Sequence, residues 1–379
     1  MKIIVIGAGI GGLFAGITLR EAGFDVDVYE RYPEPQPVGA ALTMWANALK
    51  LFQRYDMLEQ VLEDAGTFEY SEFRTSTGRT LMRVSLDQLV NRFGMPMVCM
   101  HRHRVSDTLL SRFGTQRLHL GKELVGVDQS GDGVRAHFAD GESATADVLI
   151  GADGVHSVVR SLLFPGTEPH YDGQAVWRGM VATTDVPDTS FVAFGRGSRA
   201  GWSPMGGGLV YWFGARFQPA NAPDRFGNMK RDLLSEFGEW AEPLGRLIES
   251  TPQDAIVRND VYALPKLPSW TTGRVALLGD AAHAMAPHVA QGACLAVEDA
   301  TVLALRLAAA RSPEEGLRRY SAERVERVGE VLDEAKAVGR LAAMNGPVSS
   351  RLRDLAMRLT PNKMFIEGFA KPAGYEVVG

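Results

Sequence analysis

The sequence predicts an α/β protein in which a discontinuous Rossmann-like domain holds an inserted, mainly β domain and is followed by C-terminal helices. Two observations support this fold class. A glycine-rich turn near the amino terminus, and two later turns that pair glycine with aspartate, each follow a short apolar run. The segments between these turns alternate between apolar and polar residues, as strands do. A chain of 379 residues can form one large domain or two.

The composition limits the partners of this chain. A formal net charge of −5 gives no electrostatic case for binding nucleic acid. The two cysteines, Cys99 and Cys294, form no CxxC, so we expect no disulfide framework, no metal site and a cytoplasmic location. The apolar run from Ile3 to Leu19 could be mistaken for a signal peptide, but its glycine spacing favours a fold element. No other apolar run is long enough to span a membrane.

The first glycine-rich turn predicts a dinucleotide site. The β-branched run from Ile3 to Ile6 predicts a buried parallel strand, and a helical pattern follows the turn. In the G-x-G-x-x-G spacing, Gly7 permits a tight turn, Gly9 lets the backbone approach a pyrophosphate, and Gly12 lets helix and strand pack closely. The free N–H groups at the start of the helix favour a phosphate.

An acidic residue stands at the expected distance from this turn. A second predicted strand, from Val26 to Tyr29, ends at Glu30, whose carboxylate can accept hydrogen bonds from ribose hydroxyls. The motif alone does not decide between NAD and FAD. Because no second G-x-G-x-x-G occurs, we expect one dinucleotide site.

Two later strand ends repeat this design. The apolar segment from Arg274 to Leu278 leads into Asp280, and the segment from Val148 to Ile150 leads into Asp153 and Gly154. A carboxylate at the carboxyl end of a strand in an open α/β sheet lies where such sheets bind ligands. Each aspartate could instead cap a helix or stabilise a turn. Together with Glu30, they favour a ligand site.

These three turns carry a family resemblance. The chain resembles the class A flavin-dependent aromatic hydroxylases, the p-hydroxybenzoate hydroxylase-like family. That family shows GxGxxG, then ADGxxSxVR, then GDAAHxxxPxxGQGxxxxxED, and counterparts occur here in that order at 7–12, 152–160 and 279–299. The resemblance covers roughly residues 1 to 345 and implies an FAD-binding domain.

The resemblance implies which residues contact the FAD. They are Gly7, Gly9, Gly12, Glu30, Arg31, Arg102, Leu124, Asp153, Gly154, Asp280, Gln291, Gly292 and Ala293. The helix that begins near Gly292 would direct its positive end at the flavin, which is negatively charged when reduced. The family usually has glycine where this chain has Ala290; if that position needs a positive φ, alanine costs about 1 kcal/mol or more.

The resemblance also implies the reaction. We expect an FAD-dependent monooxygenase that hydroxylates an electron-rich aromatic or heteroaromatic small molecule with NADH or NADPH and O2, through a C4a-hydroperoxyflavin. The alternatives are an FAD-dependent reductase or oxidase of the same fold and a non-catalytic flavin-binding protein. We expect a monomer or a homodimer.

The candidates for substrate binding come from the β segments and the flavin loop. Alternation in "GGGLVYWFGARF" places Leu209, Tyr211 and Phe213 on one face of a strand. Arg178 and Arg199 could pair with an anionic group, and His288, which follows Pro287, could accept or relay a proton. We nominate His288, Tyr211 and Arg199 for catalysis, and Arg178, Arg199, Tyr211, Pro287 and His288 for substrate contact.

Each candidate has a structural alternative. Tyr211 could be a core aromatic, and Arg199 could be a solvated arginine between glycines. The arrangement of Arg199 and Tyr211 is similar to that of bacterial FAD-dependent urate hydroxylases, but those carry aspartate where this chain has His288. That departure weakens urate as the substrate.

The expected boundaries follow from these assignments. The FAD-binding domain takes residues 1–70, 98–165 and 272–345; the substrate domain takes 71–97 and 166–271; the C-terminal segment takes 346–379. We expect one helix from about Met229 to Ser250. A second begins at a Ser312 cap, and its charges from Arg318 to Lys336 predict a solvated face.

Overall fold

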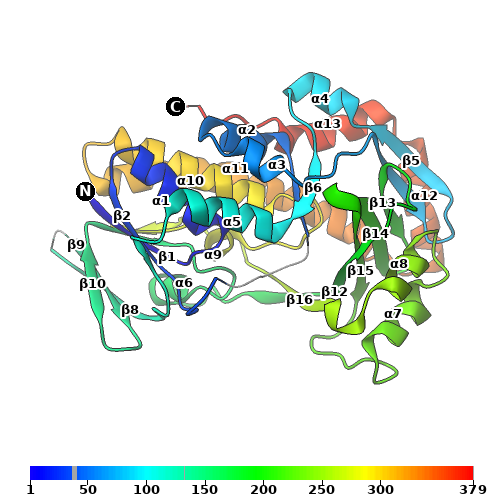
Figure 1. Cartoon of the computed structure of the whole chain (residues 1–379), viewed down its shortest axis with the longest axis horizontal. Helices are drawn as coiled ribbons and strands as arrows, with labels where there is room; N and C mark the ends of the chain where they lie inside the picture. Colours follow the sequence, from blue (N-terminus) through cyan, green and yellow to red (C-terminus); the bar gives the residue numbers. More distant parts are fainter. Residues whose placement is uncertain (36–40, 132, 379) are drawn as a thin grey trace.

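The computed structural model describes residues 1–35, 41–131 and 133–378, and the chain forms two adjoining parts (Figure 1). One part is built on a largely parallel sheet near the amino terminus, and the other on a large sheet from the middle of the chain. Within the described residues, the helices are too short or too polar to cross a membrane.

The first part has a six-stranded sheet with the order β17-β18-β11-β1-β2-β7. β1 pairs in parallel with β2 and β11, and β18 and β7 extend the sheet in parallel on either side. The turns that follow β1, β11 and β18 therefore meet at one edge of the sheet. The bounds are β1 (Lys2–Ile6), β2 (Asp25–Tyr29), β7 (Leu118–His119), β11 (Val148–Gly151), β17 (Thr271–Thr272) and β18 (Val275–Leu277).

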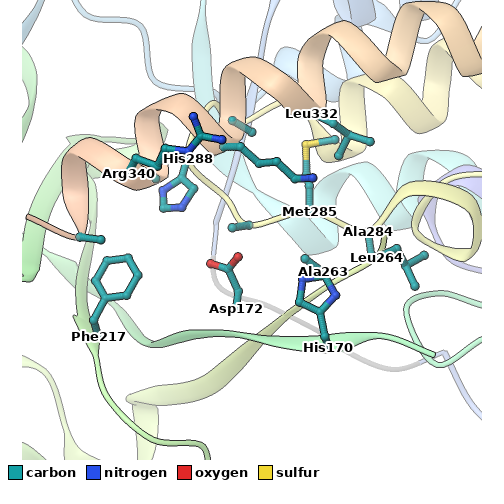
Figure 2. Close-up of a pocket in the computed structure, with 15 residues that line it drawn as sticks. His170, Asp172, Phe217, Ala263, Leu264, Ala284, Met285, His288, Leu332 and Arg340 are labelled. Atoms are coloured by element: carbon teal, nitrogen blue, oxygen red, sulfur yellow. The ribbon is translucent and has the colours of Figure 1, made fainter. Parts of the chain in front are cut away.

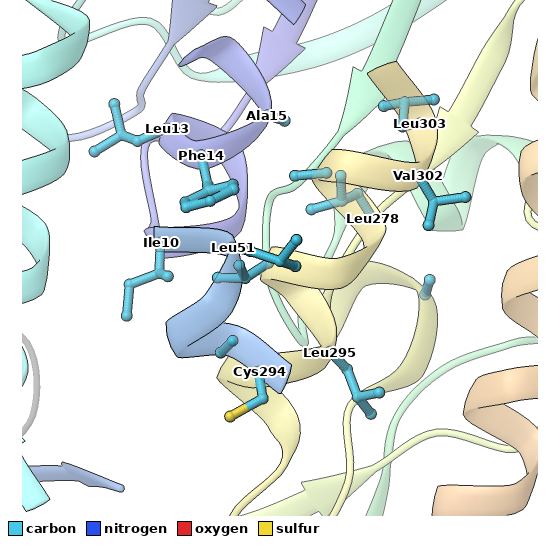
Figure 3. Packing of buried hydrophobic residues seen from close by; sticks show 14 of the residues in the cluster. Ile10, Leu13, Phe14, Ala15, Leu51, Leu278, Cys294, Leu295, Val302 and Leu303 are labelled. Atoms are coloured by element: carbon cyan, nitrogen blue, oxygen red, sulfur yellow. The ribbon is translucent and has the colours of Figure 1, made fainter. Parts of the chain in front are cut away.

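Helices pack on this sheet and on one another. α1 contacts both α5 and α10, and α10 contacts α11. Figure 3 shows the apolar side chains that fill the space between α1, α2 and α10, including Phe14, Leu51 and Leu295. The bounds are α1 (Ile10–Glu21), α2 (Ala46–Arg54), α3 (Leu58–Leu62), α4 (Asp87–Phe93), α5 (Arg102–Phe113), α6 (Val158–Leu163), α9 (Asp280–His283), α10 (Gly292–Ala308) and α11 (Pro313–Ala342).

Two small antiparallel sheets complete this part. The sheet of β8, β9 and β10 contacts β1 and β11, and the pair β3 and β6 leads into α5. The bounds are β3 (Ala41–Met44), β6 (Val98–His101), β8 (Leu124–Ser130), β9 (Gly133–Phe138) and β10 (Ser143–Ala146).

The second part is a seven-stranded sheet with the order β16-β12-β15-β14-β13-β4-β5. The sheet joins segments that lie before and after β6 in the sequence: β4 pairs with β13, and β5 pairs with β4 at the edge. The bounds are β4 (Tyr70–Thr75), β5 (Thr80–Ser85), β12 (His170–Ala182), β13 (Thr189–Phe194), β14 (Ser198–Pro204), β15 (Leu209–Phe217) and β16 (Val257–Ala263), with short 3-10 helices at Gly206–Gly208 and Gln253–Ala255.

The two faces of this sheet have different characters. Trp177, Trp202 and Trp212 are fully buried on one face with α7 (Met229–Phe237) and α8 (Leu244–Ser250). Because side chains alternate along a strand, the residues directly next to these tryptophans in the sequence project from the opposite face. That opposite face carries the polar candidates Arg178 and Tyr211.

One expectation about helices needs correction. The single helix expected from Met229 to Ser250 is two helices, because the chain leaves helical geometry between Gly238 and Pro243. The C-terminal segment contains α12 (Pro347–Leu359) and α13 (Asn362–Ala373). The Ser312 cap is confirmed, since its side chain accepts from the Glu315 amide.

Candidate functional site

The first turn has the close packing that its glycines predict. Gly7 has a φ of +103°, and a Cβ on it would lie 2.4 Å from the Ala152 oxygen. A Cβ on Gly12 would lie 1.9 Å from the Gly7 oxygen, so α1 could not approach β1 with any larger residue there. Gly9 faces open space, and α1 starts without a side-chain cap or an acidic residue in its first turn. Free backbone N–H groups therefore face an open site.

Glu30 closes this turn at the end of β2. Its Oε2 accepts from the Ala8 amide at 2.8 Å, and its Oε1 accepts from the Tyr32 amide at 3.1 Å. Each oxygen keeps a further acceptor position for a ligand hydroxyl. Arg31 is exposed, and its guanidinium lies 4.8 Å from the centre of the Tyr32 ring.

Asp153 caps the helix that follows it. Its carboxylate accepts from the Ser157 hydroxyl at 2.5 Å and from the amides of Val158 and Val159. Burial raises the pKa of Asp153 in spite of these hydrogen bonds. All of these contacts belong to a helix cap, the structural alternative given for Asp153 above. A contact between Asp153 and the cofactor stays a prediction. Gly154 beside it has a φ of +80°.

Asp280 has a different environment. It is the first residue of α9, its side chain is exposed, and its Oδ1 lies 4.0 Å from where a Cβ on Gly292 would be. Burial lowers the pKa of Arg102, and the nearby Asp280 carboxylate counteracts this effect. The structure thus brings Asp280, Arg102 and the start of α10 together. Leu124 is buried at the start of β8 and pairs with Phe138.

The loop before α10 has the positive backbone φ at Ala290 that is unfavourable for alanine. Ala290 has a φ of +52°, the left-handed region in which a Cβ is unfavourable. Gln291 is buried, and its Oε1 accepts from Asn47 Nδ2 at 3.0 Å. Gly292 and Ala293 open α10, which has no side-chain cap and no acidic residue in its first turn.

A buried ionic network supports this loop from α10 and α11. Asp299 Oδ2 accepts from the Gly279 amide at 3.0 Å and lies 2.7 Å from His283 Nε2, while Arg324 donates to Asp299 Oδ1 at 2.7 Å. Burial alone would raise the pKa of Asp299, but His283 and Arg324 hold it below its ordinary value. The residue before Asp280 is thereby fixed.

The network continues to Gln291 through Glu298. Glu298 accepts from Arg324, from Arg327 and from Asn47, whose amide nitrogen also donates to Gln291. The expectation of a solvated face from Arg318 to Lys336 is wrong for Arg324 and Arg327, which are 0% and 7% exposed. Periodicity could not reveal this, because their partners come from α10.

The candidates of the large sheet share one face. Pairing of β12 with β15 sets Arg178 opposite Phe213, and pairing of β14 with β15 sets Arg199 opposite Ala215. Tyr211 precedes Phe213 by two residues, and the expected alternation of Leu209, Tyr211 and Phe213 is confirmed by this register. Arg178 donates to Asn259 Oδ1 at 2.8 Å and hydrogen-bonds Tyr211.

Arg199 is a buried cation. It is 6% exposed, its Nε has no partner among the described residues, and its guanidinium lies 5.8 Å from the centre of the Phe213 ring. Burial lowers the pKa of Arg199 to about 10, so it stays charged at neutral pH. Burial also raises the pKa of Tyr211 to about 12, which keeps its hydroxyl a donor.

His288 lies beside Arg199 and is half-buried. Burial and the Arg199 charge lower the pKa of His288 to about 3, so the ring is neutral at physiological pH. Its Nε2 lies 3.1 Å from Gln174 Nε2. Pro287 before it is exposed, so its expected substrate contact rests on the backbone of the loop.

A cavity of about 280 Å³ opens beside His288. Figure 2 shows Asp172, His170 and Arg340 around the same space as His288. A Cβ on Gly339 of α11 would lie 2.7 Å from His288 Nε2, so this glycine makes room for the ring. The lining residues are His170, Asp172, Phe217, Ala263, Leu264, Ala284, Met285, Ala286, His288, Leu332, Ala335, Lys336, Gly339, Arg340 and Ala343.

Sequence reasoning missed Asp172, Gln174 and Asn47. The first two lie on β12 at even spacings from Arg178, and a strand from His170 onwards would have placed them on the same face. Asn47 had no signal, because its partners Gln291 and Glu298 are about 250 positions away in the chain.

The residues present fit an FAD. Two helices, α1 and α10, begin with uncapped N–H groups, and neither has an acidic residue in its first turn. These ends suit a pyrophosphate and an anionic ring. Between them lie the exposed Asp280 carboxylate, which can accept from hydroxyls, and Arg102, which can donate to phosphate.

Comparison with known proteins agrees with this geometry. Residues 1–335 match the family described as FAD binding domain. The chain is 33% identical to aurachin C monooxygenase/isomerase of Stigmatella aurantiaca over 95% of this chain and 94% of the relative, and 34% identical to the FAD-dependent urate hydroxylase of Klebsiella pneumoniae over 89% of each. The crystal structure of Klebsiella pneumoniae HpxO complexed with FAD and uric acid superposes with a TM-score of 0.92 at 30% identity, covering 98% of this chain and 96% of that one. The chain therefore belongs to the FAD binding domain family and is a flavin-dependent monooxygenase of the class A aromatic hydroxylases.

Proposed function

We propose that this monooxygenase hydroxylates an anionic, electron-rich aromatic or heteroaromatic compound, with NADH or NADPH as the hydride donor. The observation that supports this substrate class is the Arg199 guanidinium, which is buried on the sheet face that carries Arg178 and Tyr211 and whose Nε has no hydrogen-bond partner among the described residues. The Asp172 carboxylate offsets only part of the cost of burying this charge, so a ligand anion that pairs with it gains affinity.

The neighbouring side chains have separate roles in this proposal. Bound FAD, once reduced, supplies the activation of O2. Arg199 pairs with the anionic group and orients the ring, and Tyr211 donates a hydrogen bond to a ring oxygen. The start of α10, with Gln291, Gly292 and Ala293, stabilises negative charge beside it. The apolar side chains around the site exclude water.

The experiment is a panel of phenols, hydroxybenzoates, purines, hydroxypyridines and quinolones under ¹⁸O2. We expect at least one anionic member to accelerate NADH or NADPH oxidation and to gain one ¹⁸O atom. The Arg199→Met variant should lose this reaction, whereas Arg196→Met, at an exposed position three residues away, should keep it. Nucleotide oxidation that never labels a product would favour the reductase or oxidase alternative.

A further inference from the structure

The side chains of Asp172, Gln174 and His288 form a chain of hydrogen bonds. Asp172 and Gln174 flank Gly173, whose φ of +85° marks an irregularity in β12, and their side chains meet in a hydrogen bond. Gln174 Nε2 lies 2.6 Å from Asp172 Oδ2 and 3.1 Å from His288 Nε2. Gln174 is fully buried, so solvent does not compete for these contacts.

The Asp172 carboxylate decides the orientation of the Gln174 amide. A carboxylate can only accept, so the NH2 group of Gln174 must face Asp172 and its oxygen must face away. The second hydrogen of the same NH2 group then reaches His288 Nε2. That nitrogen must accept it with a lone pair, which leaves Nδ1 as the protonated nitrogen of the neutral ring.

The Nδ1 atom of His288 is free to bind something else. It is buried and has no hydrogen-bond partner among the described residues. Buried donors are nearly always satisfied in folded proteins. The neighbour that acts on this ring is Arg199, which also lacks a partner for its Nε. Two unsatisfied donors therefore lie together at the end of the substrate face.

We propose that Asp172 and Gln174 are positioning residues that hold His288 as its Nδ1–H tautomer, so that this end of the substrate site offers a hydrogen-bond donor. The consequence for the substrate rests on the proposed hydroxylase function. The compound must bring an acceptor, such as a ring carbonyl, a phenolate oxygen or an unprotonated ring nitrogen, to His288. An aspartate at this position would instead select a ring N–H or O–H.

The tautomer is measured directly by NMR on the FAD-bound protein labelled with ¹⁵N-histidine. The two ring nitrogens resonate far apart when only one is protonated, and His288→Asn identifies the signal. We expect the Nδ1–H form in the wild-type protein at pH 6 to 8. An Nε2–H form or a charged ring in this range overturns the proposal.

Two variants test whether Gln174 sets the tautomer. Gln174→Met removes the amide and should give a mixture of tautomers. Gln174→Glu replaces the donor by an acceptor and should move the proton to Nε2, which a general loss of packing would not do. Gln53→Met, at an exposed position on α2, is the control and should leave the His288 signal unchanged. An unchanged Nδ1–H signal in both Gln174 variants contradicts the positioning role.

Substrate binding provides the second readout, followed by the perturbation of flavin absorbance. Gln174→Met should weaken binding of acceptor-bearing aromatics about three- to tenfold, the value of one hydrogen bond. His288→Asp should reverse the preference between a ring that presents a carbonyl and one that presents N–H. If His288 shows the expected Nδ1–H tautomer but no aromatic is hydroxylated, the proposed function is wrong and the positioning role stands. If hydroxylation occurs while both Gln174 variants keep the wild-type tautomer and the wild-type preference for acceptor-bearing aromatics, the positioning role is wrong and the proposed function stands.

Discussion

Arg199 is the residue whose energetics are most unusual. Its guanidinium is desolvated by the sheet and by Phe213, its Nε has no hydrogen-bond partner among the described residues, and the Asp172 carboxylate offsets only part of the desolvation. Such a group destabilises the folded protein and persists where a ligand compensates for it. We therefore expect Arg199 to lower the stability of the ligand-free protein and to increase its affinity for an anionic ligand.

Replacing Arg199 should separate these two effects. Arg199→Met should raise the free energy of unfolding of the ligand-free protein by about 1 kcal/mol, because it removes a buried charge whose desolvation outweighs the attraction of Asp172. The same change should raise KM for an anionic substrate at least about tenfold, equivalent to about 1.4 kcal/mol. Chemical denaturation and steady-state kinetics measure the two quantities. Lower stability in the variant would show that Arg199 has a structural partner.

His288 should make stability depend on pH. Its pKa is about 3 in the folded protein, while an unfolded histidine titrates near 6.5. Between these values the unfolded chain binds more protons, so the free energy of unfolding decreases as the pH falls from about 6.5 towards 3. His288→Asn lacks this contribution. Urea denaturation at pH 4 to 7 should show the advantage of the wild type over the variant shrinking at low pH. Parallel curves would contradict a neutral folded His288.

At the scale of single elements, the loop before α10 combines strain with function. Ala290 adopts a positive φ that glycine would adopt freely, and its neighbours Gln291 and Gly292 direct the start of α10. Strain of this kind persists only where the surroundings fix the backbone. Here the fixing groups are Asn47, which holds Gln291, and Asp299, which holds Gly279 and His283.

Glycine at this position should relieve the strain. Ala290→Gly should change the free energy of unfolding by about +1 kcal/mol or less, because relief of the left-handed Cβ contact is partly offset by chain entropy. Bound FAD should stay unchanged. The matched control is Ala304→Gly inside α10, which should destabilise by about 1 kcal/mol or more. Thermal unfolding of both holo-variants measures the difference, and equal destabilisation would mean that Ala290 is not strained.

Elements with a local signal could be predicted from the sequence, and elements defined by distant contacts could not. The strand, turn and helix around Gly7, Gly9 and Gly12 follow from residue size and spacing. The break after Gly238 was missed because the helical pattern continues on both sides of it. The buried roles of Arg324 and Arg327 were missed because a sequence window cannot contain the carboxylates of α10.

At the scale of the whole molecule, one ionic network joins the flavin loop to the two long helices. Arg324 bridges Glu298 and Asp299, which in turn hold Asn47, Gly279 and His283. The turn at Gly279 and the loop that contains Gln291 thus depend on helices from the last third of the chain. The expected division into a discontinuous FAD-binding domain and a substrate domain is compatible with this arrangement and remains our proposal.

Breaking this network should affect the entire fold. Arg324→Met removes the cation that two buried carboxylates share and leaves Glu298 with Arg327 and Asp299 with His283, which should lower the free energy of unfolding by about 3 kcal/mol. Arg319→Met removes an exposed ion pair with Glu315 on the same helix and should cost less than about 1 kcal/mol. Chemical denaturation of both variants, with the FAD content measured in parallel, provides the test. Similar costs for the two variants would mean that the buried network is not needed for stability.

The central claim is that three separated turns and one face of the large sheet surround the same flavin and substrate. The most direct measurement is a crystal structure of the protein with FAD and an anionic aromatic compound that it hydroxylates. We predict the flavin ring between the start of α10 and the face that carries Arg178 and Tyr211, with the anionic group hydrogen-bonded to Arg199. An anion bound elsewhere, with Arg199 still unpaired, would contradict the account.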